Sequence, residues 1–187
     1  MPLEIVHRAA PCRNVPVTFT LELMFRVLPA LLVVACCTAG ADTLCGAGEQ
    51  VAFSCRIGKS RKIVSLCASP ALTRDTGSLT YRFGLPGRVE LQFPRGHAEG
   101  AARQFRYAHY FRAQIDRTEV SFFLGSVKYT IFSYYEAGEA PPMLEGVRVS
   151  QPGRNTEFVC SGSAVVDFSM LEQSLLCDGE NALGSCK

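Results

Sequence analysis

Two histidines and a glutamate beyond residue 41 are the residues whose types best suit a metal site. His97 and Glu99 lie in the Gly- and Ala-rich stretch PRGHAEGAA, and His109 alternates with aromatic residues further along the chain. Imidazole and carboxylate groups are common zinc ligands. The alternative, which we favour, is that His97 is a solvated loop residue and His109 a hydrogen-bonded strand residue. We therefore predict no metal site.

Catalytic chemistry has no clear signal in this sequence. The Gly-x-Ser-x-Gly pattern, which presents a serine nucleophile on a sharp turn, is absent. The glycines of GLPG and QPGR have the spacing of hairpin turns and not that of a phosphate-binding loop. We predict no catalytic residues and no cofactor. A hydrolase whose site assembles from residues distant in sequence stays an alternative.

Six cysteines follow residue 41, and their even number favours disulfide bonds. None of them forms the C-x-x-C pair of a thiolate metal site. Six cysteines allow fifteen pairings, and sequence alone does not choose among them. We expect a local clasp near the C-terminus, a link between the first and last strands, and a link between the remaining two cysteines. The expected bonds are Cys177–Cys186, Cys55–Cys160 and Cys45–Cys67.

Aromatic side chains on one face of a predicted hairpin are the best candidates for a binding surface. Phe123, Phe132 and Tyr134 lie on its nominally outer face, near Lys128. Exposed aromatic rings next to charged groups are typical of contact surfaces. The alternative is that a helix or a second sheet covers these rings. A second candidate is the loop from Pro94 to Arg103, whose composition predicts mobility.

The elements that would position these residues are short β-strands. From Glu49 to Ser161 the chain alternates between apolar and polar residues in short runs separated by Gly and Pro. A capping-box pattern predicts one short helix near 169–177. We therefore predict an all-β, disulfide-bonded fold, an antiparallel barrel or sandwich of about 8–9 strands with one short C-terminal helix.

Turn residues predict the register of three hairpins. Two-residue turns are expected at 125–126 and 152–153, and a three-residue loop at 85–87. A slip of one residue would turn the apolar side chains outward, so the register is well specified. The predicted partners are Phe122–Tyr129 and Glu119–Phe132, Val147–Phe158 and Arg148–Glu157, and Tyr81–Leu91 and Arg82–Glu90.

The first 41 residues contain the three parts of a secretory signal. We interpret 1–23 as an over-long start and 24–41 as the signal, with a short positive region, an apolar run too short to span a bilayer, and the small residues of TAGA. The alternative is that Met1 is the true start. We then expect one β-domain over 42–177 and a C-terminal tail over 178–187.

A lipid anchor is the alternative to release. Val33-Val34-Ala35-Cys36 resembles the bacterial lipobox, and lipidation at Cys36 would tether the protein to a membrane. It would also leave Cys37 as an unpaired thiol. Cleavage after Ala41 leaves the even set of cysteines, so we favour release into the periplasm or medium.

Much of residues 45–161 resembles small exported bacterial β-domain proteins. The resemblance lies in CGAGEQVAFSC, KIVSLCAS, YRFGLPGRVELQFP and a late EGVRVS. A looser resemblance is to the periplasmic inhibitors of C-type lysozyme, small β-barrels with cysteines near the barrel's ends. Members of that family insert a Ser-Gly-x-x-Tyr loop into the lysozyme cleft. The nearest string here, Ser161 to Val165, lacks the tyrosine, so no inhibitory residues are carried over.

Charge limits the class of partner. Without residues 1–41, Lys plus Arg falls from 19 to 16 and Asp plus Glu from 17 to 15, which leaves a net charge of +1. This balance argues against nucleic acid, and against a membrane unless Cys36 is lipidated. We predict an exported bacterial envelope protein, a non-catalytic domain that binds a protein or cell-envelope ligand. A lysozyme inhibitor and a hydrolase are the alternatives.

Overall fold

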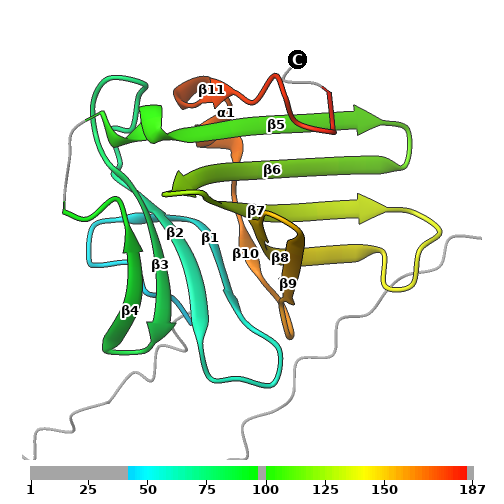
Figure 1. Ribbon diagram of the computed structural model, residues 1–187, viewed down its shortest axis with the longest axis horizontal. Helices are drawn as coiled ribbons and strands as arrows, with labels where there is room; N and C mark the ends of the chain where they lie inside the picture. Colours follow the sequence, from blue (N-terminus) through cyan, green and yellow to red (C-terminus); the bar gives the residue numbers. More distant parts are fainter. Residues whose placement is uncertain (1–41, 97–99, 185–187) are drawn as a thin grey trace, which may run out of the picture. The chain divides into compact units, whose positions relative to one another are not determined.

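Two β-sheets pack face to face as a sandwich in the computed structural model, which describes residues 42–96 and 100–184. Figure 1 shows the strands of one sheet running across those of the other. The first sheet has the order β10-β1-β2-β3-β4 and the second the order β11-β5-β6-β7-β8-β9. The first consists of β1 (Gln50–Arg56), β2 (Ile63–Ala68), β3 (Leu79–Leu85), β4 (Arg88–Phe93) and β10 (Val165–Val166). The second consists of β5 (Phe105–Arg112), β6 (Ile115–Leu124), β7 (Val127–Glu136), β8 (Met143–Gln151), β9 (Arg154–Val159) and β11 (Leu176–Cys177).

The prediction of an all-β, disulfide-bonded fold with one short C-terminal helix is confirmed, and the architecture is the sandwich. Strands β1 to β9 have six to ten residues each, whereas β10 and β11 have two. A 3-10 helix η1 (Ala101–Gln104) precedes β5. Helix α1 spans Ser169–Ser174, so it ends earlier than predicted. Among the described residues, no helix is long and apolar enough to cross a membrane.

The start of α1 differs from the predicted capping box. The side chain of Ser169 does not cap the helix; its hydroxyl donates to Asp167 at 2.6 Å. On the inner side of the helix, Leu171 is fully buried in the core between the sheets. The helix is therefore held by this apolar contact more than by its cap, as expected for a helix of six residues.

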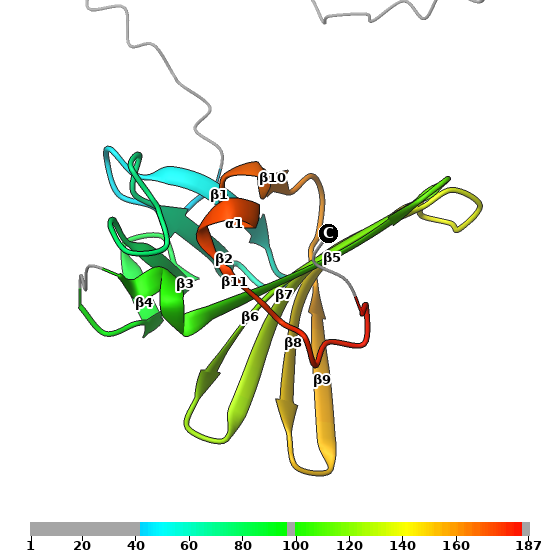
Figure 2. The same ribbon diagram turned by 90° about the horizontal axis from the view of Figure 1, so that it is seen from above.

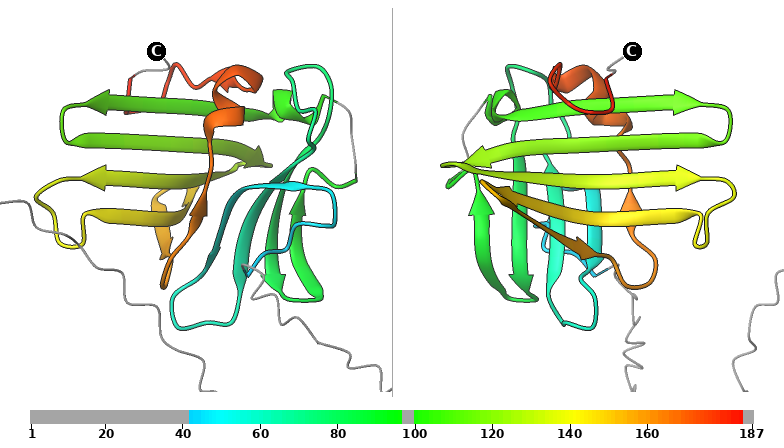
Figure 3. Two further views of the ribbon diagram at one scale, coloured as in Figure 1. Left: turned by 180° about the vertical axis from the view of Figure 1, so that it is seen from behind. Right: turned by 45° about the vertical axis from the view of Figure 1, so that its right-hand side comes forward.

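Strands β5 to β8 extend beyond the first sheet, as Figures 2 and 3 show. Burial along β5 follows from this overhang. Phe105, Tyr107 and Phe111 point to the same face, because side chains two residues apart in a strand do so. Phe105 and Tyr107 are buried, whereas Phe111 is 70% exposed. The core is thus confined to the part of the second sheet that the first sheet covers.

Two of the three predicted registers are confirmed. Phe122 lies opposite Tyr129 and Glu119 opposite Phe132 in the β6–β7 hairpin. In the β8–β9 hairpin the pairs are also those predicted, with Val147 opposite Phe158. Both hairpins close through two-residue turns with a glycine at positive φ, which matches the twist of the flanking strands.

The predicted register of the β3–β4 hairpin is wrong by two residues. Tyr81 lies opposite Phe93 and not Leu91 for two reasons: the loop has two residues and not three, with Leu85 opposite Arg88, and the pairing shifts by one more residue at a bulge between Phe83 and Gly84. A Cβ atom at Gly84 would lie only 2.4 Å from the carbonyl oxygen of the facing strand, so this close approach requires glycine. A shift of two residues keeps every side chain on its predicted face.

The predicted surface pair between Arg82 and Glu90 is wrong as a consequence of this shift. Arg82 is buried and bonds the carboxylate of Glu49 through two nitrogens, at 2.5 and 3.0 Å. Glu90 instead accepts a hydrogen bond from Lys62 at 2.7 Å. The bidentate bond fastens the segment before β1 onto the outer face of the first sheet.

Two of the predicted disulfides are confirmed. Cys45–Cys67 joins the segment before β1 to the outer face of β2. Cys55–Cys160 links β1 to the end of β9, residues 105 apart in sequence, and so ties the two sheets together. Cys177 is also disulfide-bonded, whereas its predicted partner Cys186 lies outside the described residues. Stable disulfides are typical of oxidising compartments outside the cytoplasm.

Candidate binding cavity between the sheets

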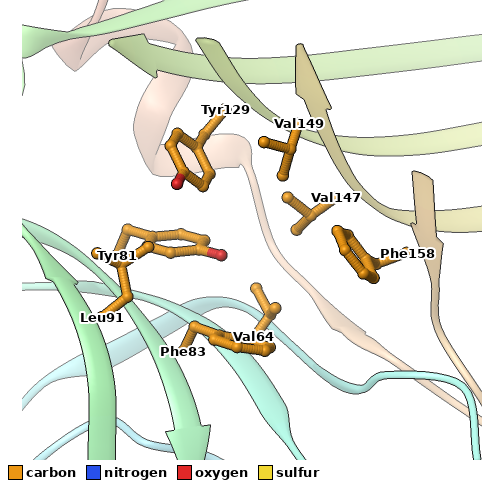
Figure 4. Close-up of a pocket in the computed structure, with 8 residues that line it drawn as sticks. All are labelled: Val64, Tyr81, Phe83, Leu91, Tyr129, Val147, Val149 and Phe158. Atoms are coloured by element: carbon orange, nitrogen blue, oxygen red, sulfur yellow. The ribbon is translucent and has the colours of Figure 1, made fainter. Parts of the chain in front are cut away.

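An apolar cavity of about 250 Å³ lies between the two sheets and is open at one side. Figure 4 shows the lining side chains converging from both sheets. Strands β2, β3 and β4 form one wall, and β7, β8 and β9 form the other. The lining residues are Val64, Tyr81, Phe83, Leu91, Tyr129, Val147, Val149 and Phe158.

Cross-strand pairing gathers the lining residues on the facing sides of the two sheets. Phe83 lies opposite Leu91, and Tyr129 lies opposite Val149. Residues directly opposite each other in an antiparallel pair point to the same face. The alternation of each strand therefore turns these side chains toward the cavity, and the charged residues between them turn away.

Stacked rings hold the two tyrosines of the cavity in place. Tyr129 stacks on Phe122 with ring centroids 5.0 Å apart, and Tyr81 packs against the same Phe122 ring at 5.0 Å. Phe93 closes the far side of Phe122 at 4.4 Å. Aromatic pairs at such distances add to the stability that burial alone gives. This cluster fixes the direction of both tyrosine hydroxyls.

The hydroxyls of Tyr81 and Tyr129 are the polar atoms of this cavity. Both project into it in Figure 4, and Tyr81 is only 2% exposed. Within the described part of the chain, no hydrogen bond is formed by either hydroxyl. Among those residues, every polar side-chain atom that is fully buried has a hydrogen-bond partner. The two tyrosine hydroxyls differ from those atoms because they face the open space of the cavity. A buried tyrosine hydroxyl usually finds a partner.

Protonation keeps the Tyr81 hydroxyl a hydrogen-bond donor. Burial raises the pKa of Tyr81 far above its usual value, and the nearby phenol of Tyr129 adds to this shift. Ionisation would place a charge in an apolar environment, which is unfavourable. At neutral pH the cavity wall therefore carries a neutral phenol at this point.

Charged groups occur at the rim and not in the lining. Lys62 lies 5.2 Å from the centre of the Phe83 ring, but its ammonium also bonds Glu90. Arg154 lines a neighbouring hollow that shares Val149 and Phe158 with the cavity. The site is thus a neutral interior next to a partly charged edge.

The predicted aromatic patch does not assemble on the surface as one exposed group. Phe123 is 58% exposed, with the Lys128 ammonium 5.8 Å from its ring centre. Phe132 is fully buried, so it offers no exposed ring. Tyr134 is half-buried and its hydroxyl donates to Glu119. Of the three predicted residues, Phe123 alone presents most of its ring to solvent.

The ring of Phe132 is covered by side chains of its own sheet, with the Arg148 guanidinium 5.4 Å and the Tyr134 ring 5.1 Å from its centre, and the segment after Cys177 is fastened on the same face. Asp178 accepts hydrogen bonds from Ser121 at 3.1 Å and from Lys128 at 2.9 Å, both on the outer face of the second sheet. Asn181 donates to Glu119, the cross-strand partner of Phe132, at 2.6 Å. The predicted tail is therefore fastened across the face on which the contact patch was expected.

Groups that could bind metal are differently placed from the predicted set. His97 and Glu99 lie outside the described residues, and His109 forms a hydrogen bond with Asp116 at 2.9 Å. Elsewhere in the described chain, potential ligand atoms of Cys45, Glu49 and Cys67 lie within 4.8 Å of one another. The two cysteines share a disulfide, and the glutamate bonds an arginine, so thiolate ligands are not available there.

Sequence reasoning missed the cavity, although it placed several lining residues on the correct face. The available signal was a pair of tyrosines, Tyr81 and Tyr129, on the face predicted to form the core. A phenol hydroxyl in a core needs a partner, and neither strand offers one.

Comparison with known proteins gives no further guide to this site. The Ser161 to Val165 string, the nearest match to an inhibitory loop, runs from the residue after Cys160 to the first residue of β10; Gly162 and Ser163 are exposed, whereas Ala164 is partly buried against the core. No family model, curated protein or solved structure matches this chain. Function is therefore inferred from the side chains themselves.

Proposed function

We propose that this chain is an exported, non-catalytic binding domain that holds a small apolar ligand, or an apolar group of a larger one, between its two sheets. The observation that carries the proposal is the open cavity of about 250 Å³ with an apolar lining and two phenol hydroxyls that have no hydrogen-bond partner among the residues the structure describes. Pockets of this character, mostly apolar with few polar groups, are the usual binding sites of small molecules.

Cavity size supports a compact ligand. An engineered apolar cavity of about 150 Å³ is large enough to bind benzene. The present cavity is larger than that, but smaller than the roughly 300–1,000 Å³ of pockets that enclose drug-sized molecules. A molecule of one or two rings, or a branched hydrocarbon of similar size, suits this space.

The chemistry of the lining supports binding over catalysis. Among the described residues, those that line the cavity offer no carboxylate, imidazole, thiol or amine. Proton transfer near neutral pH needs a group whose pKa lies near that range, whereas the pKa of Tyr81 is raised. What the site provides is shape, apolar surface and hydrogen-bond donors.

An oxidising location outside the cytoplasm completes the proposal. The disulfides Cys45–Cys67 and Cys55–Cys160 suit such a compartment. We propose the periplasm or the medium, reached through the signal segment expected at 24–41. A lipid at Cys36 would give the same domain at a membrane surface.

Filling the cavity from within tests this function. Equilibrium dialysis with naphthalene should show one saturable site on the wild-type protein. Val149→Phe adds a ring to the lining and should weaken that binding at least about tenfold, because the added ring occupies the ligand's space. Val165→Phe is the matched control, since Val165 is exposed on β10 and does not line the cavity.

Circular dichroism of both variants shows that each is folded. Absence of a saturable site in the wild type, or equal binding by Val149→Phe and wild type, would contradict the proposed function.

A further inference from the structure

We propose that the ligand is an uncharged molecule of one or two rings that carries a hydrogen-bond acceptor, and that the hydroxyls of Tyr81 and Tyr129 donate to this acceptor. This inference rests on the proposed function and specifies the class of ligand. It would place the acceptor inside the cavity and not at its mouth, because both hydroxyls project into the cavity.

The need for an acceptor follows from two hydroxyl donors that have no partner in residues 42–96 and 100–184. Tyr81 is 98% buried and, within the described residues, its hydroxyl has no protein partner. A buried hydroxyl without a hydrogen bond is unfavourable, and a ligand that supplies the bond removes this cost. An apolar ligand of the same shape would displace water from both hydroxyls and would offer no hydrogen bond to replace the ones lost. A site built with such donors therefore discriminates in favour of an acceptor.

Hydroxyls can also accept hydrogen bonds, so the direction of the bond needs a reason. The pKa of Tyr81 is raised by burial and by the neighbouring phenol, so its proton stays in place. Only an acceptor satisfies that proton, whereas a ligand that donated to the oxygen would leave the proton without a partner. Both hydroxyls project into the same cavity, so a carbonyl or ether oxygen of one ligand is offered two donors. A carbonyl oxygen has two lone pairs for this purpose.

Electrostatics of the lining favours a neutral ligand. The lining side chains carry no formal charge when their phenols are protonated. A carboxylate inside the cavity would lose its hydration without gaining an ion pair, which is strongly unfavourable. Two cations lie beside the lining: Lys62, which is paired with Glu90, and Arg154, which lines the neighbouring hollow.

The rings of the lining favour a cyclic ligand. Tyr81, Phe83, Tyr129 and Phe158 surround the space on both sheets. Aromatic side chains interact best with flat apolar groups in stacked or edge-to-face geometry. Phe158 is 42% exposed at the open side, so it can pack against the part of a ligand nearest the opening.

Two ligands of almost equal shape test the acceptor directly. Acetophenone carries a carbonyl oxygen, and α-methylstyrene carries a methylene group in the same place. We expect the wild-type protein to bind acetophenone about five- to tenfold more tightly, the effect of one good neutral hydrogen bond. Benzoate, which is similar in shape but charged, should bind more weakly than acetophenone.

Variants that remove one oxygen atom complete the test. Tyr81→Phe and Tyr129→Phe should each reduce the preference for acetophenone over α-methylstyrene toward unity, and leave the affinity for α-methylstyrene the same or higher. Tyr134→Phe is the matched control, because Tyr134 lies outside the cavity lining and its loss should leave the preference intact.

The outcomes separate this inference from the proposed function. Equal affinity of the wild type for acetophenone and α-methylstyrene would contradict the claim that the ligand carries an acceptor, but it would still agree with an apolar binding site. Tighter binding of benzoate than of acetophenone would overturn the neutral class. No saturable binding of any of the three ligands at millimolar concentration would overturn the proposed function together with the inference.

Discussion

Replacement of Tyr81 by phenylalanine removes one oxygen atom and keeps the ring, and we expect the empty protein to become more stable. The hydroxyl belongs to a residue that is only 2% exposed, faces the cavity, and has no protein partner among the described residues. Burial of such a group costs about 0.5–2 kcal/mol when it is only partly compensated. The free energy of unfolding of Tyr81→Phe should therefore rise by about that amount, because the ring still packs against Phe122.

The same substitution at Tyr134 should lower the free energy of unfolding, the opposite of the effect at Tyr81. The Tyr134 hydroxyl donates to Glu119, which is only 6% exposed. A hydrogen bond to a charged group contributes about 1.5–3 kcal/mol. Glu119 keeps its bonds with Arg148 at 3.1 Å and Asn181 at 2.6 Å, so we expect Tyr134→Phe to lose about 1.5 kcal/mol, near the lower end.

Urea unfolding of the oxidised proteins, followed by far-UV circular dichroism, measures both changes. The two variants should differ by about 2 kcal/mol or more, a difference of several degrees in melting temperature for a domain of this size. If Tyr81→Phe is destabilised by 1 kcal/mol or more, its hydroxyl has a structural partner. That result would refute the reasoning that leaves this donor for a ligand.

Three other changes have expected outcomes. Phe132→Ala should cost about 3–5 kcal/mol of unfolding free energy because it empties a buried site, whereas Phe123→Ala should change it by less than about 0.5 kcal/mol; equal effects in urea unfolding would contradict the structure. Burial alone would raise the pKa of Asp178, but its hydrogen bonds outweigh this and hold that pKa below its usual value, so stability should be complete above about pH 4 and fall as the pH drops through the lower folded pKa. Asp178→Asn should lack this part of the acid-induced loss in urea midpoints between pH 5 and pH 2. Replacement of both Cys55 and Cys160 by alanine should cost about 4–5 kcal/mol, because the bond closes a loop of about 100 residues; a cost below about 1 kcal/mol in urea would show that it does not hold the sheets together.

The β6–β7 hairpin could be predicted from the sequence because two independent signals agree there. The Gly125-Ser126 turn and the apolar alternation both require Phe122 opposite Tyr129, as observed. The β3–β4 hairpin could not, because its turn allows either a three-residue loop or a two-residue loop followed by a bulge, and both place the side chains on the same faces. The bulge at Gly84 decides between these registers, and a bulge depends on the close approach of the facing strand, which alternation does not encode.

The sequence pattern also could not predict which side chains cover the outer face of the second sheet. Alternation correctly places Phe132 on the face away from the core, but it does not say what covers that face. Arg148 lies over the Phe132 ring. Asp178 and Asn181, which come 46 and 49 residues after Phe132 in the chain, fasten the C-terminal segment on the same face. Pairing of Cys55 with Cys160 was accessible because both cysteines lie beside strands whose order was clear.

The cavity depends on the distance between sheets, which no local pattern determines. Val147, Val149 and Tyr129 could be assigned to the core face from their hairpins, and the structure places them there. Whether facing side chains fill the space between the sheets depends on how the sheets cross and on the bulge in β3. The tyrosine hydroxyls on that face were the remaining signal for a polar ligand group.

The measurement that tests the central claim most directly is a methyl-resolved NMR titration of the valine-labelled protein with acetophenone. We expect saturable shifts of the methyl signals of Val64, Val147 and Val149, which line the cavity on both sheets, and unchanged signals from the exposed Val165. Shifts confined to exposed valines such as Val165, or no saturable shift at any valine, would contradict the claim that the space between the sheets is a binding site.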